Sequence, residues 1–433
     1  MKLKLFALCC ILTGSFGVLY AAPNVKVLKM DRALSEEAKE CITCHADKYP
    51  GTVLDWRSSR HAHSGVSCVE CHVKPKDYAS AAQNCEGVKG TNTYVSALVT
   101  PKTCATCHPS EVKQFNRSGH WRSAAQIVPK AGLLALKEKH QGQNHPELKG
   151  APNENGCMQC HGDTIKLDAN KQATAATWPN TGIGNIWPDG STGNCNVCHT
   201  RHRFNIAEAR RPDACASCHL GPDHPNIEIY LNSKHGHVYK TEGMFEWTFD
   251  SPPDAWEPGD YRAPTCATCH MSGIGDLKTT HDVSRRLYWN LWAKVSKKRN
   301  SNDPMNMLTG DGDRGRKEMK QVCSNCHTSK IIDNFFVRGD RQVKLYNEAY
   351  WGPAKKMMDD LKAKNLLMEN PWKDPFQTRF YLMWHHEGRI MRMGAMMGGP
   401  DYAHWHGSFE VMRDMAEMEV IYDKRIKAGK IDH

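Results

Sequence analysis

The sequence lacks several features that define common folds. Beyond residue 21 it has no apolar run long enough to span a bilayer. No segment of useful length alternates apolar and polar residues, which argues against a fold built on β-sheets. The lysines and arginines are scattered rather than gathered on one periodic face, so the net charge of +10 is weak evidence for nucleic-acid binding. There is no repeat of fixed period, and the one recurrent unit is a five-residue motif.

Cysteine, in contrast, is abundant. The 433 residues contain 19 cysteines, and 16 of these belong to eight copies of C-x-x-C-H. A single C-x-x-C suits a disulfide, a redox pair or half a zinc site, but eight copies that each precede a histidine are typical of c-type haem attachment. Both thiols then add to the haem vinyl groups, and the histidine is the proximal iron ligand. The predicted attachment residues are Cys41, Cys44, Cys68, Cys71, Cys104, Cys107, Cys157, Cys160, Cys195, Cys198, Cys215, Cys218, Cys266, Cys269, Cys323 and Cys326, with proximal ligands His45, His72, His108, His161, His199, His219, His270 and His327.

The overall composition agrees with eight bound haems. A mean hydropathy of −0.62 is too polar for an ordinary core of this size, and porphyrin rings would supply the missing apolar volume. Each haem also brings two propionates, so the basic excess is expected to be mostly internal compensation. Three cysteines lie outside the motifs: Cys85 is expected to be a free thiol, and Cys9 and Cys10 belong to the N-terminal segment.

The N-terminus has the pattern of an export signal. A basic Met1-Lys-Leu-Lys4 precedes an apolar run from Leu5 to Leu19, and small residues follow near Ala22. Residues 1–21 are therefore predicted to be a cleaved signal peptide, which would remove Cys9 and Cys10 and leave the mature chain in the periplasm. An uncleaved membrane anchor is the alternative.

The chain is predicted to be mainly α-helical and to have two parts. Residues 22–338 hold all eight motifs at irregular spacing, so we expect an octahaem-binding domain of short helices and loops wrapped on haems. Residues 339–433 contain no cysteine and show helical periodicity from Tyr346 to Leu367, from Pro375 to Met397 and from His404 to Ala428. The methionines there are expected to fill helix packing or a subunit interface rather than bind iron. The histidines of this part remain open candidates: His385, His386, His404 and His406.

The second axial position of each iron decides between conduction and catalysis. A second histidine closes the site for electron transfer, whereas an open position admits a substrate. Asp223-His224 is a different feature, because a carboxylate beside a histidine can accept and deliver protons. The predicted distal ligands, each with a surface histidine as the alternative, are His61, His120, His202, His235 and His281, and the less favoured candidates are His63, His140, His145 and His237.

Six segments match one known arrangement of motifs and intervening residues. They are Cys195-x-x-Cys-His-Thr-Arg-His202, Cys215-Ala-Ser-Cys-His219, Asp223-His224, Ser233-Lys-His235, Ala263-Pro-Thr-Cys-Ala-Thr-Cys-His-Met271 and Thr280-His281. Over about residues 40 to 425, their order and spacing resemble the octahaem hydroxylamine oxidoreductase family. The related multihaem nitrite and tetrathionate reductases carry a lysine in place of one motif histidine, and no C-x-x-C-K occurs here.

The resemblance implies a catalytic centre at the fourth motif. A five-coordinate haem would be attached to Cys157 and Cys160, with His161 as its proximal ligand. Asp223 and His224 match the distal acid/base pair of the family. The resemblance also implies that the other seven haems are bis-histidine relays and that the chain forms a homotrimer through its C-terminal helices.

The direction of the reaction depends on a further residue. In oxidising members of the family, a tyrosine from a neighbouring subunit is covalently joined to the catalytic porphyrin. The corresponding segment here, from Met396 to Gly407, departs from those members, and either Tyr402 or Trp405 can be placed at the key position. We therefore favour the reductive branch without a cross-link, which reduces nitrite and hydroxylamine to ammonium. Electrons would come from a separate partner, such as a membrane-bound tetrahaem quinol dehydrogenase. The alternatives are a hydroxylamine or hydrazine dehydrogenase and a non-catalytic multihaem electron carrier.

Overall fold

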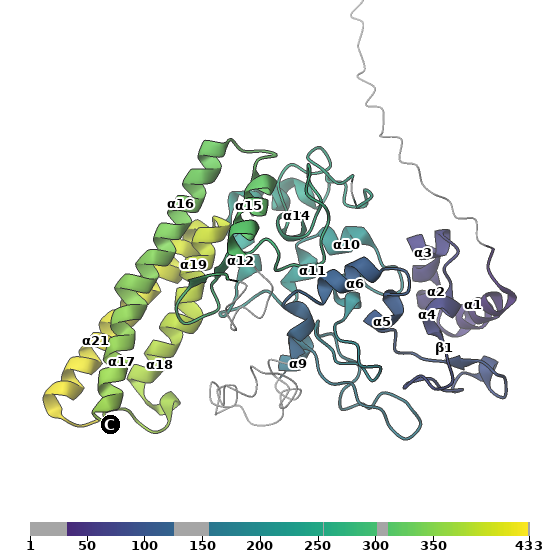
Figure 1. The fold of residues 1–433 in the computed structure, drawn as a ribbon, viewed down its shortest axis with the longest axis horizontal. Coiled ribbons are helices and arrows are strands. Elements are labelled where there is room, and N and C mark those ends of the chain that lie inside the picture. Colours follow the sequence, from purple (N-terminus) through teal and green to yellow (C-terminus); the bar gives the residue numbers. More distant parts are fainter. Residues whose placement is uncertain (1–32, 125–155, 254, 301–310, 432–433) are drawn as a thin grey trace, which may run out of the picture.

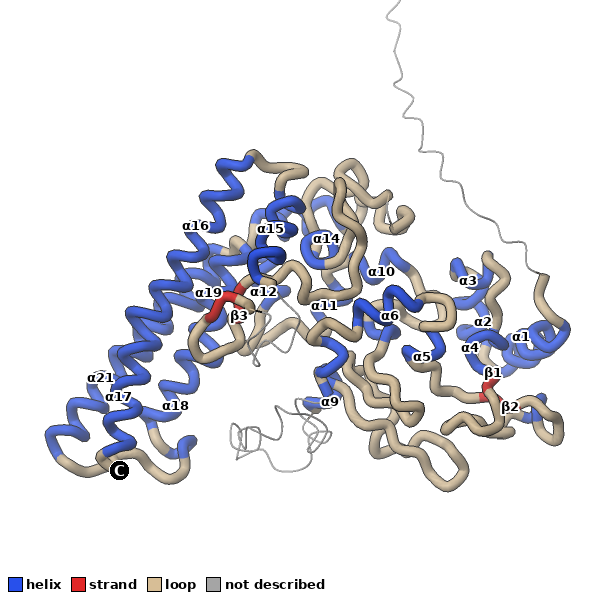
Figure 2. The backbone as a smooth tube through the Cα atoms, in the orientation of Figure 1, coloured by secondary structure: helices blue, strands red, loops and turns tan. Residues whose placement is uncertain are grey.

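The computed structural model describes residues 33–124, 156–253, 255–300 and 311–431. These residues form mainly helices, which confirms the predicted fold class. Short helices and loops make up one arm of the molecule, and long helices lie side by side in the other (Figures 1 and 2). The predicted signal peptide, Cys9, Cys10, His140 and His145 lie outside the described residues.

The first arm is built from single-turn and two-turn helices joined by loops. Several begin at a hydroxyl cap: Ser67 and Glu70 form a capping box before α4, and Thr265 and Thr268 form one before α14. Two short antiparallel ribbons, β1 (Val73–Lys74) with β2 (Tyr94–Val95) and β3 (Trp289–Asn290) with β4 (Lys297–Lys298), are its strands. The α-helices are α1 (Glu36–Lys48), α2 (Pro50–Arg57), α3 (Arg60–His63), α4 (Cys68–His72), α5 (Pro101–Cys104), α6 (Pro109–Phe115), α9 (Cys157–His161), α10 (Ile206–Arg210), α11 (Asp213–Ala216), α12 (Asn226–Asn232), α13 (Lys234–Val238), α14 (Cys266–His270) and α15 (Gly312–Cys323). The remaining turns of this arm are the 3-10 turns η1 (Glu86–Val88), η2 (His120–Arg122) and η4 (Cys195–Val197) and the π-helical turn η5 (Tyr239–Gly243).

The second arm contains the long C-terminal helices that the periodicity predicts. π-helical turns connect several of them directly, and Gly398, with a positive φ of 72°, ends α19. The predicted division at residue 338 falls inside α16 and stays a prediction. The elements are α16 (Ser329–Leu345), η7 (Tyr346–Trp351), α17 (Gly352–Ala363), η8 (Pro371–Lys373), α18 (Pro375–Leu382), η9 (Met383–Glu387), α19 (Gly388–Met397), α20 (Pro400–Ala403), η10 (His404–Phe409) and α21 (Glu410–Ala428).

The core of the second arm is apolar and includes methionine. Met383, Met391 and Met418 are fully buried, so these methionines pack between helices as expected. Leu361 and Phe376 belong to the same cluster. Within the described residues, no helix is long and apolar enough to cross a membrane.

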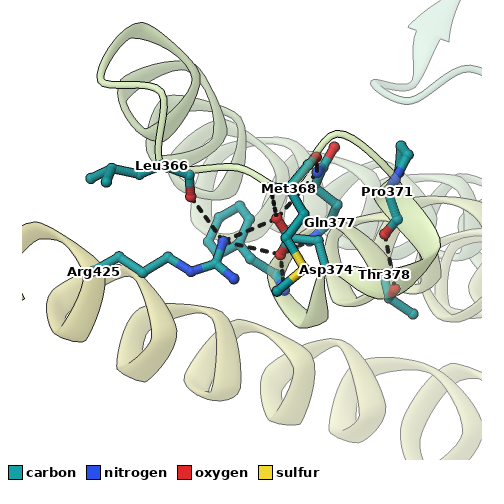
Figure 3. Close-up of polar contacts among 8 residues, drawn as sticks. Leu366, Met368, Pro371, Asp374, Gln377, Thr378 and Arg425 are labelled. Atoms are coloured by element: carbon teal, nitrogen blue, oxygen red, sulfur yellow. Dashed lines mark hydrogen bonds and ion pairs between the residues drawn. The ribbon is translucent and has the colours of Figure 1, made fainter. Parts of the chain in front are cut away.

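One ion pair inside this arm is fully buried. Arg425 of α21 lies 3.0 Å from the carboxylate of Asp374, and neither side chain is exposed (Figure 3). Asp374 also accepts hydrogen bonds from the amides of Met368 and Phe376, and Arg425 donates to the carbonyl of Leu366. The pair therefore joins the loop before α18 to the last helix.

Candidate haem centres and active site

Each C-x-x-C-H motif forms one helical turn. The amide of the histidine donates to the carbonyl of the first cysteine, for example from His108 to Cys104 at 2.8 Å and from His219 to Cys215 at 2.9 Å. Positions i, i+3 and i+4 of a helix share one side, so the two thiols and the imidazole face the same ligand. All 17 cysteines of the described residues, Cys85 among them, are free thiols. The motif cysteines are thus available for thioether bonds.

Five motif histidines lie opposite a second histidine ring. The second ring comes in each case from a different predicted distal ligand, so all five of these candidates are used once. The paired ring centroids are 6.2 Å apart for His61 and His108, 6.2 Å for His72 and His202, 6.0 Å for His120 and His219, 6.4 Å for His199 and His281, and 6.1 Å for His235 and His327.

These separations fit one iron between each pair of rings. An imidazole nitrogen lies about 2 Å from a bound metal and the ring centre about 1 Å farther, so two opposed ligands have centroids roughly 6 Å apart. Iron ligation also requires neutral imidazoles. Burial, with repulsion from the partner ring, lowers the pKa of His120 to about 3 and that of His199 to about 4. The donor set and its spacing therefore fit haem groups at these positions.

A buried serine stands two residues before three of these distal candidates. The Ser59 side chain caps α3, which carries His61, and the Ser233 side chain caps α13, which carries His235. Ser118, which precedes His120, donates to the carbonyl of Phe115. All three serines are at most 3% exposed. The serine of this Ser-x-His pattern thus fixes the backbone that carries the imidazole. The pattern could have favoured His61, His120 and His235 over the other candidates from sequence alone. By contrast, the less favoured candidates His63 and His237 are exposed.

His161 of the fourth motif has different surroundings. In the described part of the chain, no second histidine ring stands opposite His161, and the same holds for His45 and His270. The Nδ1 of His161 donates to the carbonyl of Ser123 at 3.3 Å, which leaves Nε2 as the nitrogen available to iron. Burial lowers the pKa of His161, while Ser123 and the charge of Asp223 oppose that shift. Asp223 is thus close enough for its charge to act on His161.

The motif thiols form a continuous series of neighbours. Cysteines of neighbouring motifs lie near one another, and in the described part of the chain the fourth motif joins the series where Cys160 lies near Cys218 of the sixth motif. Haems attached at neighbouring motifs would therefore lie near one another. The neighbouring pairs are Cys41 with Cys68, Cys71 with Cys104, Cys104 with Cys195, Cys198 with Cys215, Cys215 with Cys266 and Cys269 with Cys323.

Two histidines of the C-terminal arm converge on Asp223. Its Oδ1 lies 3.0 Å from Nδ1 of His385 and 2.9 Å from Nε2 of His386. Burial works against ionisation of the Asp223 carboxyl, but the two histidines outweigh it and hold its pKa well below the usual range. Burial lowers the pKa of His385 to about 4, against the attraction of Asp223. The three ligand atoms lie within 4.8 Å of one another, a grouping that could hold a metal ion.

His224 lies against an aromatic and cationic wall. Its ring meets Trp292 edge-on at 5.0 Å, and burial lowers its pKa to about 4, with a further contribution from the nearby His219. The guanidinium carbon of Arg389 lies 4.7 Å from the Trp292 ring centre, and its Nη2 donates to the Trp292 carbonyl at 3.1 Å. Arg389 is 6% exposed, and burial lowers its pKa to about 10. Six residues form a closed circuit in which each contacts the next and the last contacts the first. In order they are Asp223, His224, Trp292, Arg389, Trp384 and His385.

Comparison with known proteins finds multihaem cytochromes along the chain. Three families match: "Seven times multi-haem cytochrome CxxCH" over residues 189–370, "Cytochrome c3" over 134–220 and "Cytochrome c554 and c-prime" over 21–73. A Kuenenia stuttgartiensis protein named "Probable nitrite reductase-hydroxylamine oxidoreductase fusion protein" is 26% identical over 407 residues. That match covers 83% of this chain but only 44% of the relative's length.

The chain is therefore a multihaem cytochrome c that is similar to hydroxylamine oxidoreductase-like proteins. Two solved structures share its fold. A "Hypothetical multiheme protein" superposes with a TM-score of 0.75 at 22% identity and covers 91% of this chain and 96% of that chain. A reducing HAO-like protein complex of Kuenenia stuttgartiensis superposes with a TM-score of 0.61 at 21% identity and covers 91% and 86%.

In this multihaem cytochrome, Tyr402 is not among the described residues that contact Asp223, His385 or His386. Its ring stacks on His406 at 5.1 Å, and His406 Nδ1 is 2.8 Å from Asp401 Oδ2. Trp405, the other residue considered for the key position, is 57% exposed. The absence of a cross-link between Tyr402 and the haem of a neighbouring subunit remains a prediction, as does the choice of Tyr402 or Trp405 for the key position.

No role was predicted from the sequence for His385 or His386, and neither Arg389 nor Trp292 was predicted to belong to the site. These residues lie far from Asp223 along the chain, and folding of the C-terminal arm brings them beside it. The available signal for a functional role was the adjacent pair His385-His386, which lies far from every C-x-x-C-H motif. Periodicity alone could not say which distant residue the pair would meet.

Proposed function

We propose that this multihaem cytochrome is a periplasmic octahaem oxidoreductase that reduces nitrite and hydroxylamine to ammonium. The observation that carries the proposal is the contrast around His161. Five motif histidines have an opposed imidazole. Of the three that have none within the described residues, His161 is the one whose pKa responds to the charge of Asp223. An iron without a second protein ligand can bind a small nitrogen compound.

In this proposal the residues around the fourth motif have separate roles. Cys157 and Cys160 would hold a haem, which would supply a redox-active iron for binding the substrate. His161 is the proximal ligand, and its Nδ1 hydrogen bond to Ser123 fixes the ring. Each residue of the fourth motif thus serves attachment, orientation or electron entry.

Asp223 and His224 serve proton transfer. Reduction of nitrite to ammonium takes up six electrons and eight protons, so the pocket needs groups that accept and donate protons. The depressed pKa of Asp223 keeps its carboxylate ionised, so that it accepts hydrogen bonds and stabilises positive charge on His224. Neutral His224 can donate a proton from one ring nitrogen while it accepts one at the other. His385 and His386 border the carboxylate, with ring nitrogens 3.0 and 2.9 Å from its Oδ1.

Electrons would reach the fourth motif along the series of neighbouring motifs. The seven other haems are proposed as relays, with His61, His120, His202, His235 and His281 as distal ligands of five of them. The contact of Cys160 with Cys218 supports entry to the catalytic centre from the sixth motif. Electron supply would come from a separate redox partner, for which a membrane-bound tetrahaem quinol dehydrogenase is suited.

The reductive direction rests on the segment around Tyr402 and on the names of the relatives. One relative is named as a nitrite reductase fused to a hydroxylamine oxidoreductase, and one structure as a reducing complex. This chain spans less than half of the fusion protein, so it corresponds to part of that protein. The second candidate is a hydroxylamine or hydrazine dehydrogenase, which the second half of the fusion protein's name favours.

A homotrimer is proposed through the C-terminal arm. Trp405, Phe409, Met412 and Val420 of η10 and α21 are exposed apolar residues, with 38% to 68% of their surface accessible. Burial of such side chains against a second copy would remove apolar surface from water. This exposed apolar surface and the resemblance support the assembly.

Intact mass, optical spectra and turnover of the holoprotein test the function together. We expect a mass with eight haems and no additional cross-link, a high-spin ferric centre, and ammonium formation from nitrite with a chemical reductant. His224→Ala should keep eight haems and lose most nitrite reduction, whereas the exposed control His237→Ala should retain it. A tyrosine-haem cross-link with a displaced ferrous band would establish the dehydrogenase instead. Absence of any high-spin signal and of turnover would leave the electron-carrier alternative.

A further inference from the structure

The cluster of Asp223, His385 and His386 has a geometry that proton transfer does not require. Both imidazoles approach the same carboxylate oxygen, Oδ1, at 3.0 and 2.9 Å. The three side chains are partly to largely buried, with 38% of the Asp223 side chain, 11% of the His385 side chain and 20% of the His386 side chain exposed. Three potential ligand atoms therefore meet in one protected place.

The local backbone makes this convergence possible. Consecutive residues of an α-helix point about 100° apart, so neighbouring histidines do not ordinarily reach one atom. His385 and His386 lie in the π-helical turn η9 (Met383–Glu387), where the wider turn changes the direction of both side chains. Such turns inside α-helices are frequent at functional sites. Tyr381 stacks on His385 at 4.5 Å and meets His386 edge-on at 5.6 Å, which fixes both rings.

Hydrogen bonding to Asp223 does not account for both rings. Nδ1 of His385 is buried and makes no hydrogen bond to any protein group in the described residues, although it lies 3.0 Å from Asp223 Oδ1. The distance is short enough for a hydrogen bond, but the angle is not suitable, because an N–H bond at this nitrogen would not point at the oxygen. A buried ring nitrogen left without a partner is destabilising. A ligand that both atoms contact would remove this destabilisation.

We propose that Asp223, His385 and His386 bind a divalent first-row transition-metal ion that is separate from the haem irons. Two imidazoles and one carboxylate form a donor set that such ions take, and three protein ligands leave positions open for water or a small ligand. Neighbouring ligands of a six-coordinate ion with bonds of about 2.1 Å are about 3 Å apart, as are both histidine nitrogens from Asp223 Oδ1.

Charged groups around the cluster act in both directions. The carboxylate of Glu387 follows His386 directly in η9 and favours a cation. The buried guanidinium of Arg389, one turn beyond His385, opposes a cation. Arg389→Gln should therefore tighten metal binding, an effect opposite in sign to that of removing a ligand.

The inference goes beyond the proposed reductase function. A carboxylate that binds a metal through one oxygen keeps its second oxygen free to accept a proton, and His224 is not among the proposed ligands. Metal binding can thus be measured on a protein that does or does not reduce nitrite, and failure of one proposal leaves the other standing.

Metal analysis of the purified holoprotein tests the site. We expect about one non-haem metal ion per chain when total metal is compared with haem counted by its absorbance, or one Zn²⁺ bound on titration of metal-stripped protein. His385→Ala and His386→Ala should each lose this equivalent while they keep the wild-type haem count. The matched control is His406→Ala, because His406 also pairs with an aspartate, Asp401, but without a second histidine.

Anomalous scattering gives a second measurement in case a variant loses its fold. Crystals of the unaltered protein exposed to Zn²⁺ should show a peak at the zinc edge among the three side chains. The proposal would be overturned if the total metal content of the purified protein equalled its haem iron and if the wild type and both variants bound the same amount of Zn²⁺. So would a zinc peak elsewhere and none at this cluster.

Discussion

Replacing His61 with alanine should open one haem centre and leave the others unchanged. The His61 and His108 rings, 6.2 Å apart, leave room for one iron between them, and each of the other four pairs has its own two histidines. Loss of the His61 imidazole therefore affects one of eight proposed centres, and about one-eighth of the haem should change from low-spin to high-spin. Ser59 and the rest of α3 keep their contacts in this variant, so the haem count should stay at eight.

Ferric EPR with spin quantification measures the change, and added imidazole should reverse it by refilling the open position. His63→Ala is the matched control, since His63 lies in the same helix, is exposed and faces no motif histidine among the described residues. The reasoning would be refuted if His61→Ala left the high-spin signal unchanged, or if His63→Ala raised it equally. A loss of haem from His61→Ala without a spin change would also count against ligation.

Three further outcomes are expected. Arg425→Met leaves the Asp374 charge buried without its partner, so the local free energy of unfolding should fall by about 3–5 kcal/mol. Faster hydrogen exchange in α18 and α21 would report this loss, and the control Lys427→Met, at an exposed residue, should change exchange little. Asp414 has a pKa raised to about 7 by burial and by Glu387; the folded chain therefore binds its proton more tightly, and stability falls as pH rises from about 4 through about 7. Asp414→Asn should flatten that pH dependence of the thermal midpoint, and an unchanged slope would contradict it. Tyr402→Phe should alter neither the haem mass nor the ferrous spectrum if no cross-link exists, whereas loss of a displaced band would show that one does.

Local chemistry accounts for what the sequence predicts well. The motifs specify their own helical turns, because a cysteine, a second cysteine three residues later and a histidine after that share one side of a turn. The long C-terminal helices follow from periodic apolar residues that bury in one core, as Leu361 and Met418 do. Both features depend on residues that are close in sequence, so no distant information is needed.

Features that depend on distant contacts could not be read from sequence. His202 was predicted as a distal ligand, but only the folded chain brings its ring opposite His72. The convergence of His385 and His386 on Asp223 needs a π-helical turn, and the apolar periodicity of the segment from Pro375 to Met397 suits an unbroken α-helix equally well.

The pairing of histidines also bears on how the protein is made. If the chain is exported, as proposed, it emerges from its N-terminus. A motif whose second ligand lies upstream, as His61 does for His108, could then close as soon as its own haem is attached. His72 must wait for His202, which follows three more motifs. A haem at the second motif would therefore keep an open position until residue 202 has emerged, and a chain that stops earlier would lack the imidazole that faces His72.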